Sequence, residues 1–176
     1  MSLQSAVEFA TRAHFGSWRE GDFPLPYVTH PVEVLLNLRY VGLVTDTEML
    51  CAAVLHDTVE GESATFEQIE KQFGPRVCSL VKELTRSEPT GIEVADLTKE
   101  EIWKLRSRML LDEIAKMSSD AKQIKLADRL SNVQDARRTK SARKLRRYLD
   151  QTEKILAIVP RETNRALWNA IEAEIH

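Results

Sequence analysis

The dipeptide His56-Asp57 places an imidazole and a carboxylate at the end of the most apolar segment of the chain. Residues 49–55 before it are all hydrophobic, and a helix that is apolar on every side is predicted to be central and buried. Adjacent residues on a regular helix point about 100° apart, so these two side chains would share one metal ion only at a helix end. The alternative is an ordinary core histidine followed by a capping aspartate. Either arrangement needs partners for the buried polar groups.

A second polar pair lies within residues 125–132. Asp128 and Asn132 are four residues apart, so on a helix they share one face, and Ile124 lies one turn earlier on the same face. An apolar residue at that position indicates that the Asp128 face is turned into the protein. Asp128 is therefore a candidate functional carboxylate, and a structural ion pair is the alternative.

A third candidate, His30, stands directly before Pro31 at the predicted start of an amphipathic helix, where proline is favoured. A histidine there could also serve only as a cap. Together, His30, His56, Asp57 and Asp128 provide two imidazoles and two carboxylates. This donor set suits Mn²⁺, Fe²⁺ or Zn²⁺ with positions open to water, rather than a closed structural zinc site.

The elements that must position these residues are predicted to be helices almost throughout, because strand-like alternation and internal repeats are missing. We expect an all-α fold, a bundle of about nine helices in a single domain of residues 1–176. Capping boxes are predicted at Thr45 with Glu48, Thr65 with Gln68, and Thr98 with Glu101. Helices are predicted over residues 3–14, 30–42, 46–55, 66–73, 75–84, 99–117, from 119 or 120 onward, 141–159 and 160–175, with loops at 16–27 and 86–97.

Charge and composition exclude several classes of function. The 176 residues carry 25 Lys and Arg against 27 Asp and Glu, a net charge of −2, which argues against a general nucleic-acid coat or a polybasic membrane anchor. No run approaches the ~18 apolar residues of a membrane span, and the first residues lack a signal-peptide pattern. Cys51 and Cys78 lie in apolar helical patterns without CxxC spacing, as expected for buried reduced thiols. We expect a cytoplasmic protein with no membrane or nucleic-acid partner.

Three ordered motifs connect the chain to a known family. They are Tyr-x-x-His-Pro from Tyr27, His-Asp-Thr-Val-Glu from His56, and Leu-Ala-Asp-Arg-Leu-x-Asn from Leu126. In this order they resemble the HD-domain metal-dependent phosphohydrolases. More narrowly, the chain is similar to the hydrolase domain of the RelA/SpoT family and to its stand-alone small alarmone hydrolases. The resemblance implies removal of pyrophosphate from the 3′ position of ppGpp or pppGpp.

The resemblance also implies roles for residues at the matching motif positions. His30, His56, Asp57 and Asp128 are expected to bind one Mn²⁺ ion. Glu60 matches the acidic residue that helps to activate the attacking water. This fits general physical expectations, because a metal ion makes water more acidic and a carboxylate can accept the proton.

Three further residues match positions that face the nucleotide in this family. Asn132 matches a nucleotide-contacting asparagine and is expected to take part in catalysis. Arg19 falls where the family has an arginine against the guanine base. Tyr148 falls where a tyrosine of the last helices faces the nucleotide. Basic side chains beside a metal ion would suit a polyphosphate substrate. Those predicted to bind it are Lys104, Arg108 and Lys144.

The sequence departs from the family pattern at the residue after Glu60. The family typically has a second acid there, and this chain has Gly61. Glu62 is one residue further on and is a candidate substitute in a reshaped loop. Ser131 also replaces the aromatic residue or histidine that usually precedes the family asparagine.

These departures leave three readings of function open. The first is a ppGpp pyrophosphohydrolase. The second keeps the metal and changes the substrate to NADPH or a 5′-nucleotide. The third is a nucleotide-binding regulator whose turnover is weakened by Gly61. A small-molecule nucleotide is the expected partner in all three, and assembly with further copies of the chain is left open.

Overall fold

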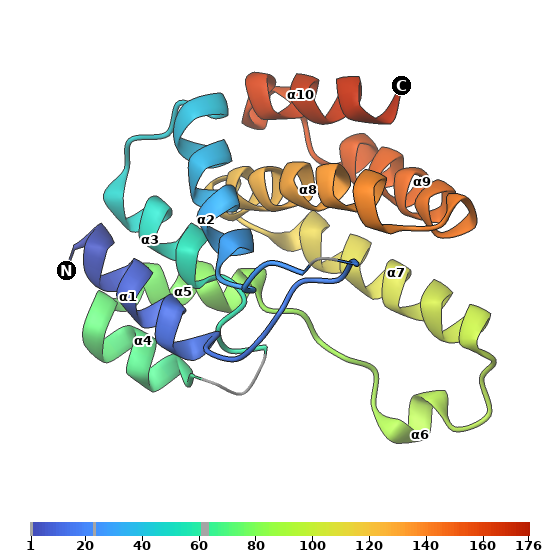
Figure 1. The fold of residues 1–176 in the computed structure, drawn as a ribbon, viewed down its shortest axis with the longest axis horizontal. Helices are drawn as coiled ribbons and strands as arrows, with labels where there is room; N and C mark the ends of the chain where they lie inside the picture. Colours follow the sequence, from blue (N-terminus) through green and yellow to red (C-terminus); the bar gives the residue numbers. More distant parts are fainter. Residues whose placement is uncertain (1, 23, 61–63) are drawn as a thin grey trace.

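The protein is described here by a computed structural model, which covers residues 2–22, 24–60 and 64–176 (Figure 1). Gly61 and Glu62 lie outside the described residues. Within these ranges no β-strand forms, and the expectation of an all-α fold is confirmed. The α-helices of eight or more residues are α1 (Leu3–Ala13), α2 (Thr29–Leu36), α3 (Thr47–Leu55), α4 (Phe66–Phe73), α5 (Pro75–Leu84), α7 (Lys99–Lys116), α8 (Ser119–Thr139), α9 (Ala142–Ile158) and α10 (Arg165–Ile175).

Three shorter elements complete the described chain. The π-helix η1 (Asn37–Val41) continues α2, the one-turn helix α6 (Gly91–Val94) interrupts the segment predicted to be a loop, and the 3₁₀ turn η2 (Arg161–Thr163) precedes α10. The last helix therefore begins later than predicted. Asn164 caps it, and its side chain accepts a hydrogen bond from the Leu167 N–H.

The predicted capping box at Thr45 is wrong, whereas those at α4 and α7 are present. Asp46 caps α3 instead, and its Oδ1 accepts from the backbone N–H groups of Glu48 at 2.9 Å and Met49 at 3.0 Å. A carboxylate at this position also interacts favourably with the positive end of the helix dipole, an advantage that a threonine hydroxyl lacks.

Helix α3 lies at the centre of the bundle, in contact with α1, α2, α5 and α8. Every residue from 49 to 55 is buried, which confirms the prediction from its uninterrupted apolar sequence. Because the helix is surrounded, the residues at its carboxyl end emerge inside the protein. His56 and Asp57 are both buried there.

The long helix α8 forms the second structural axis. It packs against α2, α3 and α5, and on its other sides against α9 and α10, which lie side by side with it in Figure 1. Asp128 lies near its middle and is buried together with Ile124, as the shared helical face predicts. The amino end of α2, the carboxyl end of α3 and the middle of α8 therefore meet at one place. No helix in the described ranges is long and apolar enough to cross a membrane.

We predict that Gly42→Ala destabilises the fold by about 1–3 kcal/mol, the usual effect of forcing extra atoms into a packed site. A Cβ at Gly42 would lie 2.8 Å from the Leu38 carbonyl oxygen and 2.9 Å from Leu167 Cδ1 on α10. Gly91→Ala is the control, because a Cβ there has no neighbour within 4 Å among the described residues. Urea unfolding measures both variants, and equal stability of the two would contradict the tight approach of η1 to α10.

Candidate metal and nucleotide site

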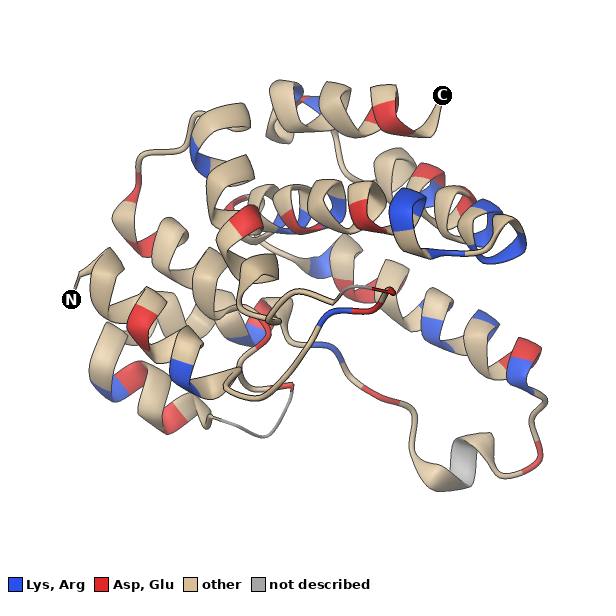
Figure 2. Ribbon diagram, in the orientation of Figure 1, with Lys and Arg blue, Asp and Glu red and all other residues tan. Residues whose placement is uncertain are grey.

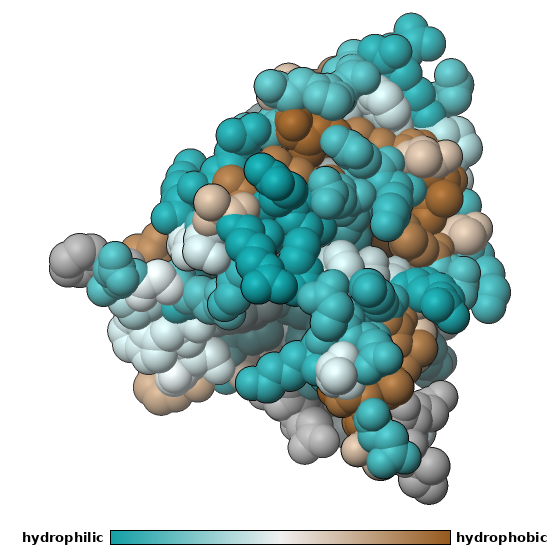
Figure 3. Space-filling model, turned by 90° about the vertical axis from the view of Figure 1, so that its right-hand side faces the viewer, coloured by the Kyte–Doolittle hydropathy of each residue, from teal (hydrophilic) through white to brown (hydrophobic). Residues whose placement is uncertain are grey.

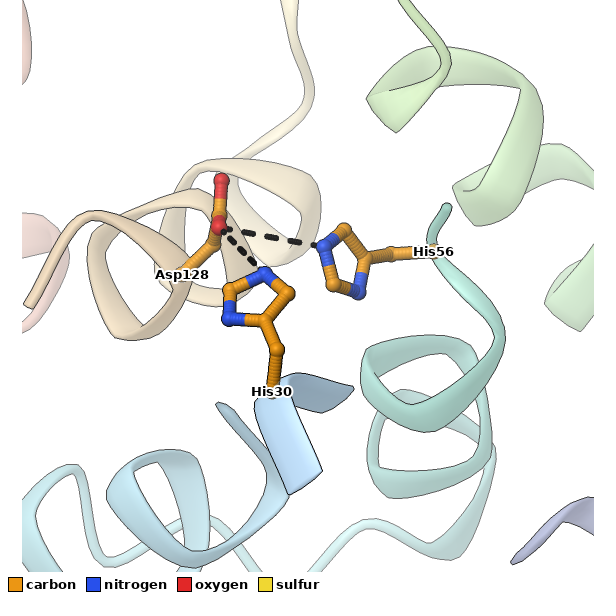
Figure 4. A group of neighbouring side chains, drawn as sticks. All are labelled: His30, His56 and Asp128. Carbon is orange, nitrogen blue, oxygen red and sulfur yellow. Dashed lines mark ion pairs between the residues drawn. The ribbon is translucent and has the colours of Figure 1, made fainter. Parts of the chain in front are cut away.

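Three of the four predicted metal ligands converge from three helices (Figure 4). The Oδ1 atom of Asp128 lies 3.3 Å from Nε2 of His30 and 3.7 Å from Nε2 of His56. One donor atom of each of the three side chains lies within 4.8 Å of the others, and all three side chains are buried. The geometry is compatible with a single shared cation.

The end of α3 explains how His56 and Asp57 can lie near the same point. The helix stops at Leu55, and both the N–H and the hydroxyl of Thr58 bond to the Leu55 carbonyl, at 3.1 and 2.8 Å. The chain therefore leaves the α-helix through a tighter i→i+3 turn, and both side chains remain buried. Asp57 Oδ2 lies 3.9 Å from His56 Nε2, and its Oδ1 lies 3.1 Å from Nε2 of His14.

Asp57 remains charged although it is buried. Burial alone would raise the pKa of this carboxyl group, but the neighbouring His56 and the hydrogen bond with His14 outweigh that effect and hold the pKa below its usual range. Its Oδ2 atom is buried and has no hydrogen-bond partner among the described residues. An unpaired buried carboxylate oxygen is costly, so this atom is suited to interact with a cation.

The two oxygens of Asp128 have separate partners. Oδ2 lies 2.9 Å from the ammonium group of Lys125, and both side chains are almost completely buried. Oδ1 faces the two histidines and also accepts a hydrogen bond from the Asn132 side-chain amide. Burial would raise the pKa of Asp128, whereas the buried ammonium group of Lys125 beside it holds the pKa well below its usual range. Lys125 therefore orients Oδ1 toward the histidines.

These side chains form the floor of a cavity of about 260 Å³. Glu60 lies on its wall, where its Oε1 accepts a hydrogen bond of 3.0 Å from the backbone N–H of Arg86. The cavity is lined by Tyr27, His30, His56, Asp57, Glu60, Arg86, Lys125, Asp128, Asn132 and Tyr148.

The comparisons with known proteins agree with this architecture. Residues 6–160 match the family model described as HD domain. The chain belongs to the HD-domain family. This confirms the family resemblance found in the sequence motifs.

Several relatives of this HD domain carry the same name. The guanosine-3′,5′-bis(diphosphate) 3′-pyrophosphohydrolase MESH1 of Drosophila melanogaster is 40% identical over 133 residues, which cover 76% of this chain and 68% of the relative. The human protein of that name is 32% identical over 174 residues, covering 97% of this chain and 90% of the relative. A solved structure described as a metazoan ortholog of SpoT that hydrolyzes ppGpp superimposes with a TM-score of 0.83 at 32% identity. It covers 98% of this chain and 92% of that one.

A second cavity of this HD domain, of about 660 Å³, adjoins the first, because Tyr148 lines both. The guanidinium of Arg129 lies over the Tyr148 ring, 3.9 Å from its centroid, and holds the ring between the two cavities. The second cavity is strongly basic, and Figure 2 shows Lys and Arg gathered at the α8–α9 turn beside it. Figure 3 shows the molecule from the right-hand side of Figure 1, and hydrophilic side chains occupy the middle of this view. Its basic residues are Lys99, Arg106, Lys140, Lys144 and Arg147.

The predicted substrate-binding residues are placed differently from one another. Lys144 and Tyr148 line the basic cavity. Lys104 and Arg108 are exposed on α7 and line neither of the two cavities, and Lys104 is paired with Glu100 at 3.9 Å. Arg19 lies outside both cavities, with its guanidinium between two carboxylates.

Several residues that line the two cavities were not predicted to be site residues from the sequence. Arg86 and Lys125 line the metal cavity, and Arg106 and Arg147 line the basic one. Lys125 lies three residues before Asp128, a spacing that pairs side chains on a helix and could have identified it. Arg147 lies over the Trp103 ring, 4.1 Å from its centroid, a contact between helices that sequence spacing does not reveal.

We predict that Lys125→Met destabilises the metal-free protein by about 3 kcal/mol, because it leaves the buried Asp128 carboxylate without its cation. Lys104→Met is the matched control. It removes an exposed helical ion pair with Glu100 and should cost less than about 1 kcal/mol. Chemical denaturation without added metal compares the two, and similar losses would show that Lys125 does not neutralise Asp128.

Proposed function

We propose that this chain is a metal-dependent hydrolase that removes pyrophosphate from the 3′ position of ppGpp. The observation that carries the proposal is the convergence of His30, His56 and Asp128, with Asp57 beside them, in a cavity that adjoins a basic one. The names of the MESH1 relatives, and the ppGpp hydrolysis ascribed to the protein of similar structure, supply the substrate. We further propose that residues 1–176 fold as one HD domain.

The donor atoms fit a divalent cation. Nδ1 of His56 lies 2.9 Å from the Ala53 carbonyl oxygen, which can only accept, so Nδ1 carries the proton and Nε2 of the neutral ring has a free lone pair. That lone pair faces Asp128 Oδ1 at 3.7 Å and Asp57 Oδ2 at 3.9 Å, both too long for hydrogen bonds. When the ring is neutral, these electron-rich atoms face one another in a buried site, and a cation between them relieves the repulsion.

His30, His56, Asp57 and Asp128 would hold the ion. We propose Mn²⁺, the ion that the family resemblance implies, and the two carboxylates are donors that suit it. When bound, such an ion acts as a Lewis acid and makes water more acidic. Lys125 is already paired with Asp128, so it keeps that carboxylate oriented. The charge that builds up on the phosphates is offset by Arg86, which lies on the cavity wall.

Glu60 is the proposed general base. Its carboxylate lines the cavity above the buried ligands and is held by the Arg86 N–H at 3.0 Å. From there it accepts a proton from the attacking water as the water oxygen bonds to the phosphorus attached to the 3′ oxygen. The bond between that phosphorus and the 3′ oxygen then breaks, pyrophosphate leaves, and the 3′ oxygen takes up a proton to become a hydroxyl group. The side-chain amide of Asn132 donates a hydrogen bond to the Asp128 carboxylate and so helps to hold that ligand in place.

The basic cavity is proposed to bind the remaining phosphates of the nucleotide. Its lysines and arginines provide charge-assisted donors, and Tyr148 connects it to the metal cavity. A nucleotide with phosphate groups at both ends of its ribose would place one group near the metal ligands and the other among these side chains.

Side-by-side assays of ppGpp, NADPH and nucleoside monophosphates with and without Mn²⁺ test the proposal. We expect Mn²⁺-dependent release of pyrophosphate from ppGpp. Preferred turnover of NADPH or a monophosphate would keep the metal site and change the substrate. Binding of ppGpp without any turnover would instead indicate a regulator.

We predict that Glu60→Gln lowers kcat by about 10²–10⁴-fold, the usual contribution of a general base, without changing the bound metal. Glu67→Gln, an exposed change on α4, is the control and should leave kcat unaltered. Elemental analysis and steady-state kinetics measure both properties. Undiminished activity in Glu60→Gln would assign the base elsewhere, with Glu62 the first candidate.

We predict that Lys144→Ala raises KM about tenfold with little change in kcat, since one charge-assisted hydrogen bond contributes about 1.5 kcal/mol to binding. Lys154→Ala provides the control, because Lys154 is an exposed lysine of the same helix that lines neither cavity. An unchanged KM in Lys144→Ala would remove the basic cavity from the substrate path.

A further inference from the structure

A chain of hydrogen bonds leads from the candidate ligand His30 away from the metal cavity. Nδ1 of His30 lies 3.2 Å from the Ser131 hydroxyl, and that hydroxyl donates to Oε2 of Glu33 at 2.8 Å. The same Glu33 oxygen accepts from Nη1 of Arg19 at 2.7 Å. Arg19 is held in turn by Asp135, whose Oδ1 lies 3.2 Å from Nη2. His30 and Ser131 are buried, and the Arg19 side chain is 9% exposed.

The direction of each bond follows from the number of hydrogens available. Ser131 has one hydroxyl hydrogen, and it is given to the Glu33 carboxylate, which can only accept. The hydroxyl oxygen therefore presents only lone pairs to His30, so His30 Nδ1 must carry the proton. In a neutral ring Nε2 is then unprotonated, and this is the nitrogen that faces Asp128 Oδ1 at 3.3 Å.

Arg19 keeps Glu33 in the accepting state. Burial alone would raise the pKa of Glu33, but the hydrogen bonds from Arg19 and Ser131 outweigh this effect and lower it. A charged carboxylate has no proton to return to the serine. The ion pair between Arg19 and Glu33 therefore sets the direction of the hydrogen bonds that lead to His30.

We propose that Glu33 and Ser131 are positioning residues that hold His30 as the Nδ1–H tautomer with Nε2 turned toward the metal. This inference rests on the proposed metal site. A hydrogen-bond partner at the ring nitrogen that does not bind the metal fixes both the tautomer and the orientation of a metal-binding histidine. Ser131 thereby acquires a function at a position where the sequence departs from the family pattern.

The two histidines of the site depend on different kinds of partner. Nδ1 of His56 bonds to the backbone carbonyl of Ala53, which no side-chain substitution removes. Nδ1 of His30 depends on two replaceable side chains. Changes at Ser131 and Glu33 therefore act on one ligand and leave the other in place.

Calorimetric titration of the metal-free protein with Mn²⁺ tests the proposal without any substrate. Ser131→Ala and Glu33→Leu should each weaken Mn²⁺ binding by about 10–100-fold, the usual effect of losing such a partner. Glu33→Gln keeps an acceptor oxygen for Ser131 and should bind Mn²⁺ more tightly than Glu33→Leu. Glu48→Gln, in an ion pair with Arg76 outside this chain of bonds, is the control and should bind as the wild type does.

A second measurement reads the tautomer directly. In ¹⁵N NMR spectra of the metal-free wild type, we expect a protonated Nδ1 and an unprotonated Nε2 for His30. In Glu33→Leu the Ser131 hydroxyl is free to donate to Nδ1, so the Nε2–H form should appear. An Nε2–H tautomer in the wild type would overturn the proposal, and so would wild-type Mn²⁺ affinity in both Ser131→Ala and Glu33→Leu.

The outcomes also separate this inference from the proposed function. Failure of the wild type to bind Mn²⁺ would contradict the proposed function, while the NMR spectra would still report the tautomer. Arg19→Ala distinguishes two roles of that arginine. Weaker Mn²⁺ binding supports its action through Glu33, whereas a raised KM with unchanged Mn²⁺ affinity supports the predicted contact with the purine base and contradicts that action.

Discussion

The burial of two carboxylates, Asp57 and Asp128, is the constraint on which the site depends. Each is charged although almost completely buried, so each requires positive or hydrogen-bonding partners. Lys125 satisfies one oxygen of Asp128, and His14 satisfies one oxygen of Asp57. The other two oxygens, Asp57 Oδ2 and Asp128 Oδ1, point toward the histidines and create a place for a cation.

The fold brings these groups together through the ends of helices. The carboxyl end of α3 is buried because the helix itself is surrounded, and the amino end of α2 and the middle of α8 close around it. These charged groups lie in the interior because the other helices surround α3 and close around its carboxyl end. The nearby basic cavity, by contrast, lies at the surface, between α7 and α9. Three of its basic side chains, Arg106, Lys140 and Arg147, form ion pairs with acidic side chains there.

The sequence was most informative where burial and polarity conflict. His56 and Asp57 were identifiable because they follow an entirely apolar helix, and Asp128 because Ile124 marks its face as buried. Cap identity was less predictable, since Asp46 and Thr45 compete for the same helix start and the carboxylate has the electrostatic advantage.

The phosphate-facing side chains could be predicted only in part. On α7, the spacing of Lys104 and Arg108 correctly describes a shared face, but that face is the exposed one, and Arg106 faces the cavity instead. Nothing in the local sequence sets the rotation of a helix whose two sides are both charged. Lys125 was overlooked because a lysine is normally expected at the surface. It is buried here because it is paired with Asp128.

Crystals of the protein soaked with Mn²⁺ and measured at the manganese absorption edge would locate the ion. We expect one anomalous peak within bonding distance of His30 Nε2, His56 Nε2, Asp128 Oδ1 and the unpaired oxygen of Asp57. A peak elsewhere, or no peak at saturating Mn²⁺, would contradict this expectation.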